Sequence, residues 1–290
     1  MALSPGHKLG QIIGDMLEAA IEPMLQDFAA AHGLYLDKKG PRASRSGTKV
    51  RLIDEYANSH DLDYVLEVGA TATQMGRPIA FIEVAWRNYT KHSRAKAQEI
   101  QGAVLPLADK YRRDAPFKGA IIAGVFTLGA RTQLESLGFT FLYFPLATLI
   151  AAFQTVGINI VFDASTPDRE LQQKVDSWIA LSPTDRQTVA QMIIRLNQSA
   201  VAEFMAALER TLTRYVVQVI ILPLHGELTT LPSIPDAIAF IDRYDQSQTA
   251  GLFARYEIQI KYSNDDRVEG QFAQKTDAIS FLHNFLPASQ

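Results

Sequence analysis

The sequence predicts an α/β fold, in which a three-layer core with a mixed sheet precedes a C-terminal α+β extension. Helix-like and strand-like hydrophobic patterns alternate through the first half of the chain. Residues 119–126 form a continuous apolar run, which is typical of a strand buried on both faces of a sheet. The composition changes at 164–168, and a mainly helical segment follows. We therefore expect two domains, a core at 1–165 and an extension at 166–290.

The core is predicted to begin with a helix and a pair of strands. Apolar residues at helical spacing indicate a long amphipathic helix over 8–31. The segments 63–70 and 77–86 have the composition of strands, and a turn or an irregular loop joins them. A helix should begin near Ser93, and Pro106 should kink or divide it. The later core elements are expected to be a strand at 119–126, a short helix at 132–138, a strand at 139–144, a helix at 146–157 and a short strand at 159–163.

The extension is predicted to start with helices and to end with alternating strands and helices. Residues 168–215 are mostly helical in pattern, with Ser182 as a helix cap and Pro183 in the first turn. The Ser, Asn and Asp residues at 263–266 have the chemistry of a hairpin turn. No internal repeat is evident. The elements expected after residue 215 are a strand at 216–222, a helix at 235–244, strands at 255–263 and 267–273, and a helix at 276–285.

Composition excludes several classes of protein. The chain has no cysteine, which excludes disulfides and cysteine-ligated zinc or iron–sulfur sites and fits the cytoplasm as the expected location. The longest apolar stretch, 139–153, is interrupted by Pro145, so we expect no membrane span. The start of the chain lacks the pattern of a secretory signal. A formal net charge of −3 gives no overall attraction to nucleic acid, so any DNA surface must be a local basic patch.

The common motifs of other chemistries are absent from the sequence. It contains no GxxxxGK[ST] or GxGxxG loop for nucleotide phosphates, no GxSxG nucleophile elbow and no HExxH pair. The six histidines are scattered without the spacing of metal ligands. Nucleotide-binding, serine-hydrolase and zinc-peptidase functions are therefore not expected.

Two carboxylates stand out in the strand pair. Asp63 opens the first strand, and Glu83 lies in a strongly apolar part of the second, where an ionised carboxylate is costly unless positive charge compensates it. If the strands pair, both carboxylates can converge at one edge, and Mg²⁺ prefers such oxygen ligands. The alternative makes Asp63 a turn residue and Glu83 the buried ion-pair partner of an Arg or Lys. Asp61 is a rival for the role of Asp63, and Glu67 is a further acidic candidate.

This pattern resembles the PD-(D/E)XK nuclease superfamily, which includes many type II restriction endonucleases. Asp63 and Glu83 match the first two elements of its motif, and Glu18 in the opening helix matches a glutamate often found near the metal. The resemblance covers residues 8–165 and implies a restriction-endonuclease-like core. The motif lysine is replaced by Ala85. The substitutes that we consider are Lys91, which we favour, and Lys96 or Arg87, unless the site binds without cutting.

The resemblance implies a metal-dependent endonuclease that hydrolyses DNA phosphodiester bonds, with a type II restriction endonuclease as the expected member. Asp63, Glu83 and the backbone carbonyl of Val84 would hold Mg²⁺, for which Mn²⁺ can substitute, and Lys91 would orient the nucleophile. The partner would be double-stranded DNA, and a homodimer would suit a palindromic site. The segment 166–290 would serve specificity or dimerisation. The alternatives are an inactive nucleic-acid-binding protein on the same fold and an unrelated α/β binding protein.

Basic residues around the strand pair support a polyanionic substrate, because phosphate contacts by Lys and Arg supply most non-specific affinity for nucleic acid. The alternative is a solvated surface loop. The expected nucleic-acid-binding residues are Lys38, Lys39, Arg42, Arg45 and Lys49 in a loop, and Arg87, Arg94 and Lys96 after the second strand.

Overall fold

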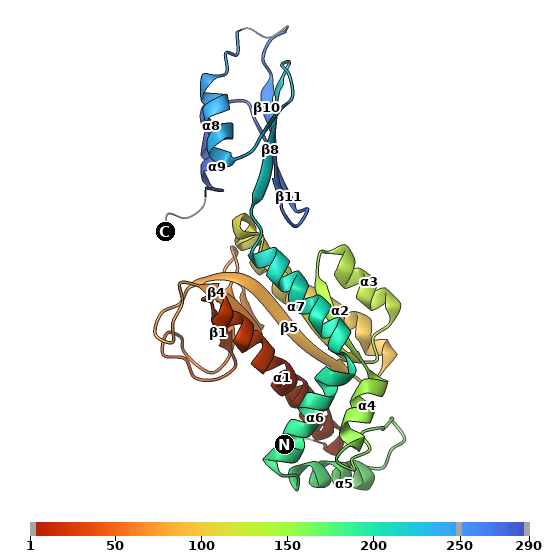
Figure 1. Ribbon diagram of the computed structural model, residues 1–290. Coiled ribbons are helices and arrows are strands. Elements are labelled where there is room, and N and C mark those ends of the chain that lie inside the picture. The colour runs from red at the N-terminus through yellow and green to blue at the C-terminus, as the bar shows by residue number, and fades with distance from the viewer. Residues whose placement is uncertain (1–3, 248–250, 287–290) are drawn as a thin grey trace. The chain divides into compact units, whose positions relative to one another are not determined.

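Figure 1 shows the computed structural model, which describes residues 4–247 and 251–286. Contacts divide the chain into two compact units, Met1–Leu208 and Glu209–Gln290. The first unit extends past the expected boundary after residue 165, because two helices beyond this point pack against the N-terminal helix. A change in composition therefore marked the end of the strand-rich part of the first unit and not the end of the unit.

The first unit is built on a five-stranded mixed sheet with the order β1-β4-β5-β6-β7. Strands β1, β4 and β5 pair antiparallel, and β5, β6 and β7 pair parallel. The sheet and the helices around it confirm the predicted α/β class with a mixed sheet. The strands span Tyr35–Lys38 (β1), Tyr64–Val68 (β4), Arg77–Arg87 (β5), Phe117–Gly124 (β6) and Thr140–Pro145 (β7).

Helices cover both faces of this sheet (Figure 1). Helix α1 packs on one face, and its first turn is capped by the Ser4 hydroxyl, which accepts a hydrogen bond from the amide of His7. Helices α2 and α3 lie on the other face, where Phe81 of β5 shares a core with Ile100 of α2. In the described part of the chain no helix is long and apolar enough to cross a membrane. The helices span Pro5–Ala31 (α1), Ser93–Lys110 (α2), Leu128–Ser136 (α3), Leu146–Gln154 (α4), Asp168–Ile179 (α5), Pro183–Leu196 (α6) and Gln198–Leu212 (α7).

A predicted strand of the first unit is absent, and the predicted division of a helix at Pro106 does not occur. Residues 159–163 form no strand, because side chains bind their carbonyls in place of a neighbouring strand. The Lys174 ammonium donates to the carbonyls of Asn159 and Val161, and the Asn88 amide donates to that of Phe162. Helix α2 is also continuous to Lys110 and is not divided at its internal proline.

The segment expected to be a basic loop contains further strands. Strand β1 adds to the edge of the main sheet, and β2 (Val50–Ile53) pairs with β3 (Ser59–Leu62) in a separate hairpin. Asp54 holds the turn of this hairpin by accepting from the amides of Tyr56 and Asn58. The hairpin ends one residue before Asp63, so it fixes the point at which the chain enters β4.

The second unit is a four-stranded antiparallel sheet with the order β11-β10-β8-β9. Both of its helices lie on the same face of the sheet (Figure 1). The α+β composition and the hairpin turn at 263–266 agree with the sequence, whereas β9 was not foreseen. The elements span Val216–Leu224 (β8), Thr229–Leu231 (β9), Ile234–Arg243 (α8), Arg255–Tyr262 (β10), Arg267–Phe272 (β11) and Lys275–His283 (α9).

The second unit contains an internal repeat that the sequence analysis missed. Each half is strand–strand–helix, and the first strands of the two halves, β8 and β10, pair at the centre of the sheet. The sequence Asp-Ala-Ile begins at Asp236 in α8 and again at Asp277 in α9. The alanines of both copies, Ala237 and Ala278, are buried. The repeat was missed because it rests on a few helix positions, whereas the strands of the two halves differ in sequence.

Candidate functional site

The strand pair brings Asp63 and Glu83 together. Strands β4 and β5 pair antiparallel with Tyr64 opposite Ile82, so Asp63, one residue before β4, lies opposite Glu83. The Asp63 carboxylate accepts a hydrogen bond of 2.7 Å from the amide of Val84. The register of the hairpin therefore places both carboxylates on the sheet face that α2 covers.

Glu83 is buried with only partial compensation of its charge. Its exposed fraction is 7%, and within the described residues its Oε1 atom has no hydrogen-bond partner. Burial and, next, the nearby charge of Asp63 raise the pKa of Glu83 to about 8, although Lys96 and the Asp63 amide oppose this shift. A buried polar atom without a partner is rare in folded proteins and calls for a function or an absent ligand.

Glu18 of α1 is the third carboxylate of this group. Burial raises its pKa to about 7, with a further contribution from the charge of Asp63. Burial also raises the pKa of Asp63, although the Val84 amide, Lys96 and Lys39 oppose this shift. The charge of Asp63 therefore raises the pKa of both glutamates, and that of Glu18 also raises the pKa of Glu83. Strongly perturbed carboxylates of this kind cluster at functional sites.

Lys96 is the lysine whose charge reaches the two facing carboxylates. It lies in the first turn of α2 and lowers the pKa of both Asp63 and Glu83. Lys91, which the sequence analysis favoured, is exposed in the short 3₁₀ helix Thr90–His92 before α2. It lines a cavity of about 510 Å³, and its charge does not contribute to the pKa shift of either carboxylate.

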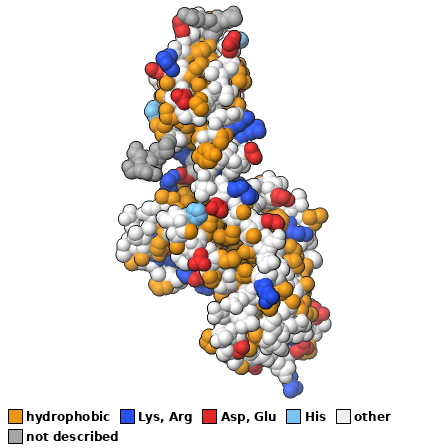
Figure 2. Space-filling view, viewed as in Figure 1, with side chains coloured by type: hydrophobic (Ala, Val, Ile, Leu, Met, Phe, Trp, Pro, Cys, Tyr) orange, Lys and Arg blue, Asp and Glu red, His pale blue; other side chains and the backbone are white. Residues whose placement is uncertain are grey.

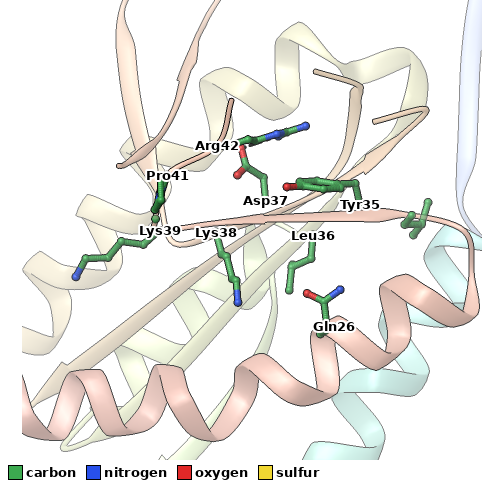
Figure 3. A pocket seen from close by; sticks show the side chains of 10 residues that line it. Gln26, Tyr35, Leu36, Asp37, Lys38, Lys39, Pro41 and Arg42 are labelled. Carbon is green, nitrogen blue, oxygen red and sulfur yellow. Dashed lines mark ion pairs between the residues drawn. The ribbon is translucent and has the colours of Figure 1, made fainter. Parts of the chain in front are cut away.

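The basic loop does not form the exposed cationic surface that the sequence suggested. Arg42 is only 6% exposed and pairs with Asp37 and Glu67. Arg45 is buried against Asp37 as well. Figure 3 shows Lys38 directed toward α1, on the opposite side of β1 from Arg42, next to a cavity of about 300 Å³.

The remaining cations of this group are more exposed. Lys49 binds Asp61 at 2.7 Å, Arg94 is exposed, and Lys39 is exposed while lowering the pKa of Glu18 and Asp63. On the face that Figure 2 shows, basic side chains are interspersed with acidic ones and form no continuous basic surface. Lys39 and Arg94 are therefore better placed for phosphate contacts than the two buried arginines.

Glu67 and Asp61, the two other acidic candidates, have partners of their own. The Glu67 carboxylate binds the Arg42 guanidinium at 3.1 and 3.0 Å and accepts from the amide of Gly76 at 2.9 Å. Asp61 binds Arg51 and Lys49, which lower its pKa to about 2. Neither carboxylate belongs to the group around Glu83.

A divalent cation would have few protein ligands at this site. In the described part of the chain, no group of three or more His, Cys, Asp and Glu side chains is arranged to hold a metal. Asp63 and Glu83 supply two carboxylates, and the unpartnered Oε1 of Glu83 is an available oxygen ligand. This donor set fits Mg²⁺, which keeps several waters and often binds only one or two carboxylates, and it does not fit an ion that requires a full protein cage.

A further residue of the site was not foreseen in the sequence. Glu99 of α2 binds Lys96 Nζ at 3.2 Å and Arg87 Nη2 at 3.4 Å. The sequence did contain a sign of this ion pair. Lys96 and Glu99 are three residues apart on a predicted helix, and each precedes a buried residue. The contact with Arg87 links the Lys96–Glu99 ion pair of α2 to the end of β5.

The comparisons with known proteins add no function. No family model and no curated protein matches the chain. A solved structure described as "Crystal Structure of Protein of Unknown Function AF1548" matches with 10% sequence identity and a TM-score of 0.28. The match covers 66% of this chain and 99% of that one. A likeness this weak carries no argument about fold or activity, so the function must be argued from the site.

Proposed function

We propose that the protein is a metal-dependent endonuclease that hydrolyses DNA phosphodiester bonds with Mg²⁺ or Mn²⁺, as in the PD-(D/E)XK superfamily. The observation that carries this proposal is the buried Glu83 carboxylate, which has an unpartnered oxygen and faces Asp63. A purely structural carboxylate at this depth would have a cation or a full set of hydrogen bonds. A bound divalent cation would supply the further positive charge.

Asp63 and Glu83 would hold the metal, with the Val84 carbonyl as a further oxygen ligand. Mg²⁺ supplies Lewis-acid stabilisation of the phosphate and makes water a better nucleophile. Glu18, with a pKa of about 7, can accept or release a proton at neutral pH. The Lys96 ammonium can donate hydrogen bonds to a phosphate oxygen and orient the attacking water, which assigns to Lys96 the role first given to Lys91.

The substrate and assembly that we propose follow from the same chemistry. Double-stranded DNA would be held through exposed cations such as Lys39 and Arg94, with the partly buried Lys96 close to the site. A homodimer would place two such sites on a palindromic sequence, as in a cytoplasmic type II restriction endonuclease. The second unit would contribute specificity or dimerisation.

The test is cleavage of plasmid and genomic DNA by the full chain with Mg²⁺ or Mn²⁺. We expect discrete fragments from the unaltered protein and none from Asp63→Ala or Glu83→Ala. Asp61→Asn is the matched control, because this carboxylate is two residues from Asp63 but binds Lys49 and Arg51. Absence of cleavage by the unaltered protein on unmodified DNA of varied sequence, or equal cleavage by the Asp63 and Glu83 variants, would contradict the proposal.

The second candidate is a nucleic-acid-binding protein that does not cut, and it is favoured by Ala85 at the lysine position of the motif. The same preparations separate the two functions. Salt-dependent DNA binding without cleavage in either metal would support the second, whereas metal-dependent fragments would support the first.

A further inference from the structure

Glu99 is placed to control the position of Lys96. Its Oε2 atom lies 3.2 Å from Lys96 Nζ and 3.4 Å from Arg87 Nη2, so one carboxylate oxygen bridges two cations from different elements. The Arg87 guanidinium also donates to the carbonyl of Trp86 at 2.8 Å, which ties it to the end of β5. Glu99 is therefore connected to the rigid sheet through Arg87 and to the flexible lysine directly.

Lys96 has two further acidic neighbours besides the one it binds. Its charge lowers the pKa of both Asp63 and Glu83, yet among the described residues it forms no ion pair with either of them. An ammonium on a flexible four-carbon stem can move toward these two carboxylates unless something restrains it. The side chain of Lys96 is 20% exposed and that of Glu99 is 58% exposed, so Glu99 draws the lysine toward solvent.

We propose that Glu99 is a positioning residue that tethers Lys96 and prevents its ammonium from occupying the place that a divalent cation needs between Asp63 and Glu83. This inference rests on the proposed metal site. Without the tether, the ammonium moves toward the two carboxylates and competes with the cation for the same oxygens. With it, Lys96 stays close enough to act on a phosphate but leaves the carboxylate pair open.

A double-mutant cycle separates the tether from the simple loss of a negative charge. Glu99→Gln removes a distant negative charge in any background, and this direct effect persists when residue 96 is neutral. The tether effect exists only when residue 96 is a lysine. We expect Glu99→Gln to weaken Mn²⁺ binding about fivefold in the natural background, the upper end for an exposed ion pair, and less than about twofold in the Lys96→Met background.

The measurement is equilibrium binding of Mn²⁺ to the full chain without DNA, by electron paramagnetic resonance or calorimetry. Asp109→Asn is the control, because this acid is also exposed on α2 but pairs with Arg112 near the far end of the helix. Thermal unfolding verifies that each variant is folded. In cleavage assays the Glu99→Gln defect should disappear at saturating Mn²⁺, which loss of structure would not produce.

The outcomes distinguish this inference from the proposed function. If the natural protein binds Mn²⁺, Asp63→Asn and Glu83→Gln abolish the binding, and Glu99→Gln has no effect or the same effect in both backgrounds, the tether is wrong and the metal site stands. If the natural protein binds no Mn²⁺, or binding survives in both carboxylate variants, the metal site and the tether are overturned together.

Discussion

Two glutamates of one β-hairpin, Glu67 on β4 and Glu83 on β5, are both buried but differ in how their charge is compensated. Glu67 is 0% exposed and both of its oxygens bind the Arg42 guanidinium. Glu83 is 7% exposed and has an oxygen without a partner in the described chain. Burial alone therefore does not identify a functional carboxylate. What distinguishes the two is whether the protein itself supplies the positive charge.

The carboxylate of Glu67 has a structural role, because its partner Arg42 connects two loops. The Arg42 guanidinium also donates to the carbonyls of Thr71 and Gln74, and it lies 4.2 Å from the centre of the Tyr35 ring. These contacts fasten the loop after β1 to the turn between β4 and β5. At Glu83 the acids Asp63 and Glu18 raise the pKa, and Lys96 lowers it without forming an ion pair among the described residues, so part of the cost of burial is left for a ligand to offset.

The largest effect that we expect from this contrast is on stability. Arg42→Ala leaves Glu67 buried without its cation and removes one of the two arginines that bind Asp37, which should destabilise the first unit by about 3–5 kcal/mol. The measurement is chemical denaturation of the variant and the natural protein. Glu83→Gln serves as the comparison, since it removes a buried carboxyl group whose Oε1 atom has no partner in the described chain, and it should be neutral or stabilising without metal. Similar losses of stability in Arg42→Ala and Glu83→Gln would contradict the distinction between Glu67 and Glu83.

The next effect is on DNA cleavage, which should depend on Glu83 even though stability does not. Glu83→Gln should lower DNA cleavage by at least about a hundredfold, because loss of even a group that only supports a metal ligand costs 10- to 100-fold. The loss should coincide with loss of Mn²⁺ binding in the same preparation. A variant that keeps metal affinity and cleavage would show that Glu83 is merely an uncompensated core residue.

A smaller effect concerns the two lysines near the site. Lys96→Ala should lower cleavage about tenfold or more, whereas Lys91→Ala should change it less than about twofold, because only Lys96 acts on Asp63 and Glu83. The measurement is kcat at saturating metal and DNA. Equal losses would restore Lys91 to the role that the sequence first suggested.

Much of the fold was predictable because its signals are local. The continuous apolar run of β6 and the helical spacing of α1 each depend on neighbours in the sequence. The strand β1 and the hairpin β2–β3 were missed because the segment is rich in Gly, Pro and basic residues, which are typical of a loop. These short strands are stabilised by pairing and not by local sequence preference. The strand at 159–163 was expected from composition alone, but Lys174 and Asn88 occupy its carbonyls.

Only those features of the site that follow from the pairing of adjacent strands could be predicted from the sequence. The facing of Asp63 and Glu83 follows from the pairing of two adjacent strands, which the sequence suggests. The burial of Arg42 against Glu67 does not, because it joins residues 25 apart through the fold of an irregular loop. The choice between Lys91 and Lys96 depends on where α2 begins and which way its first turn faces, and helix boundaries are the least certain part of a sequence-based assignment.

The smallest effect that we expect is a dependence of stability on pH in the metal-free protein. Burial raises the pKa of Glu83 from 4.5 to about 8 and that of Glu18 from 4.5 to about 7. Between roughly pH 4.5 and these values the folded chain retains protons that the unfolded chain releases, so stability must fall as the pH rises through this window. Differential scanning fluorimetry in EDTA should show Tm falling steadily between pH 5 and pH 8.

Three variants and added Mg²⁺ test which groups cause this dependence of Tm on pH. Glu83→Gln cannot release the proton, so its Tm should fall less, and Glu18→Gln should give a smaller flattening that ends near pH 7. Asp61→Asn should leave the slope unchanged, because its pKa of about 2 keeps that carboxylate ionised across the whole window. Mg²⁺ should raise Tm more at pH 8 than at pH 6, since a divalent cation binds the ionised carboxylates. Parallel curves for the natural protein and Glu83→Gln would mean that Glu83 is already ionised and compensated, as Glu67 is, and the contrast between the two glutamates would disappear.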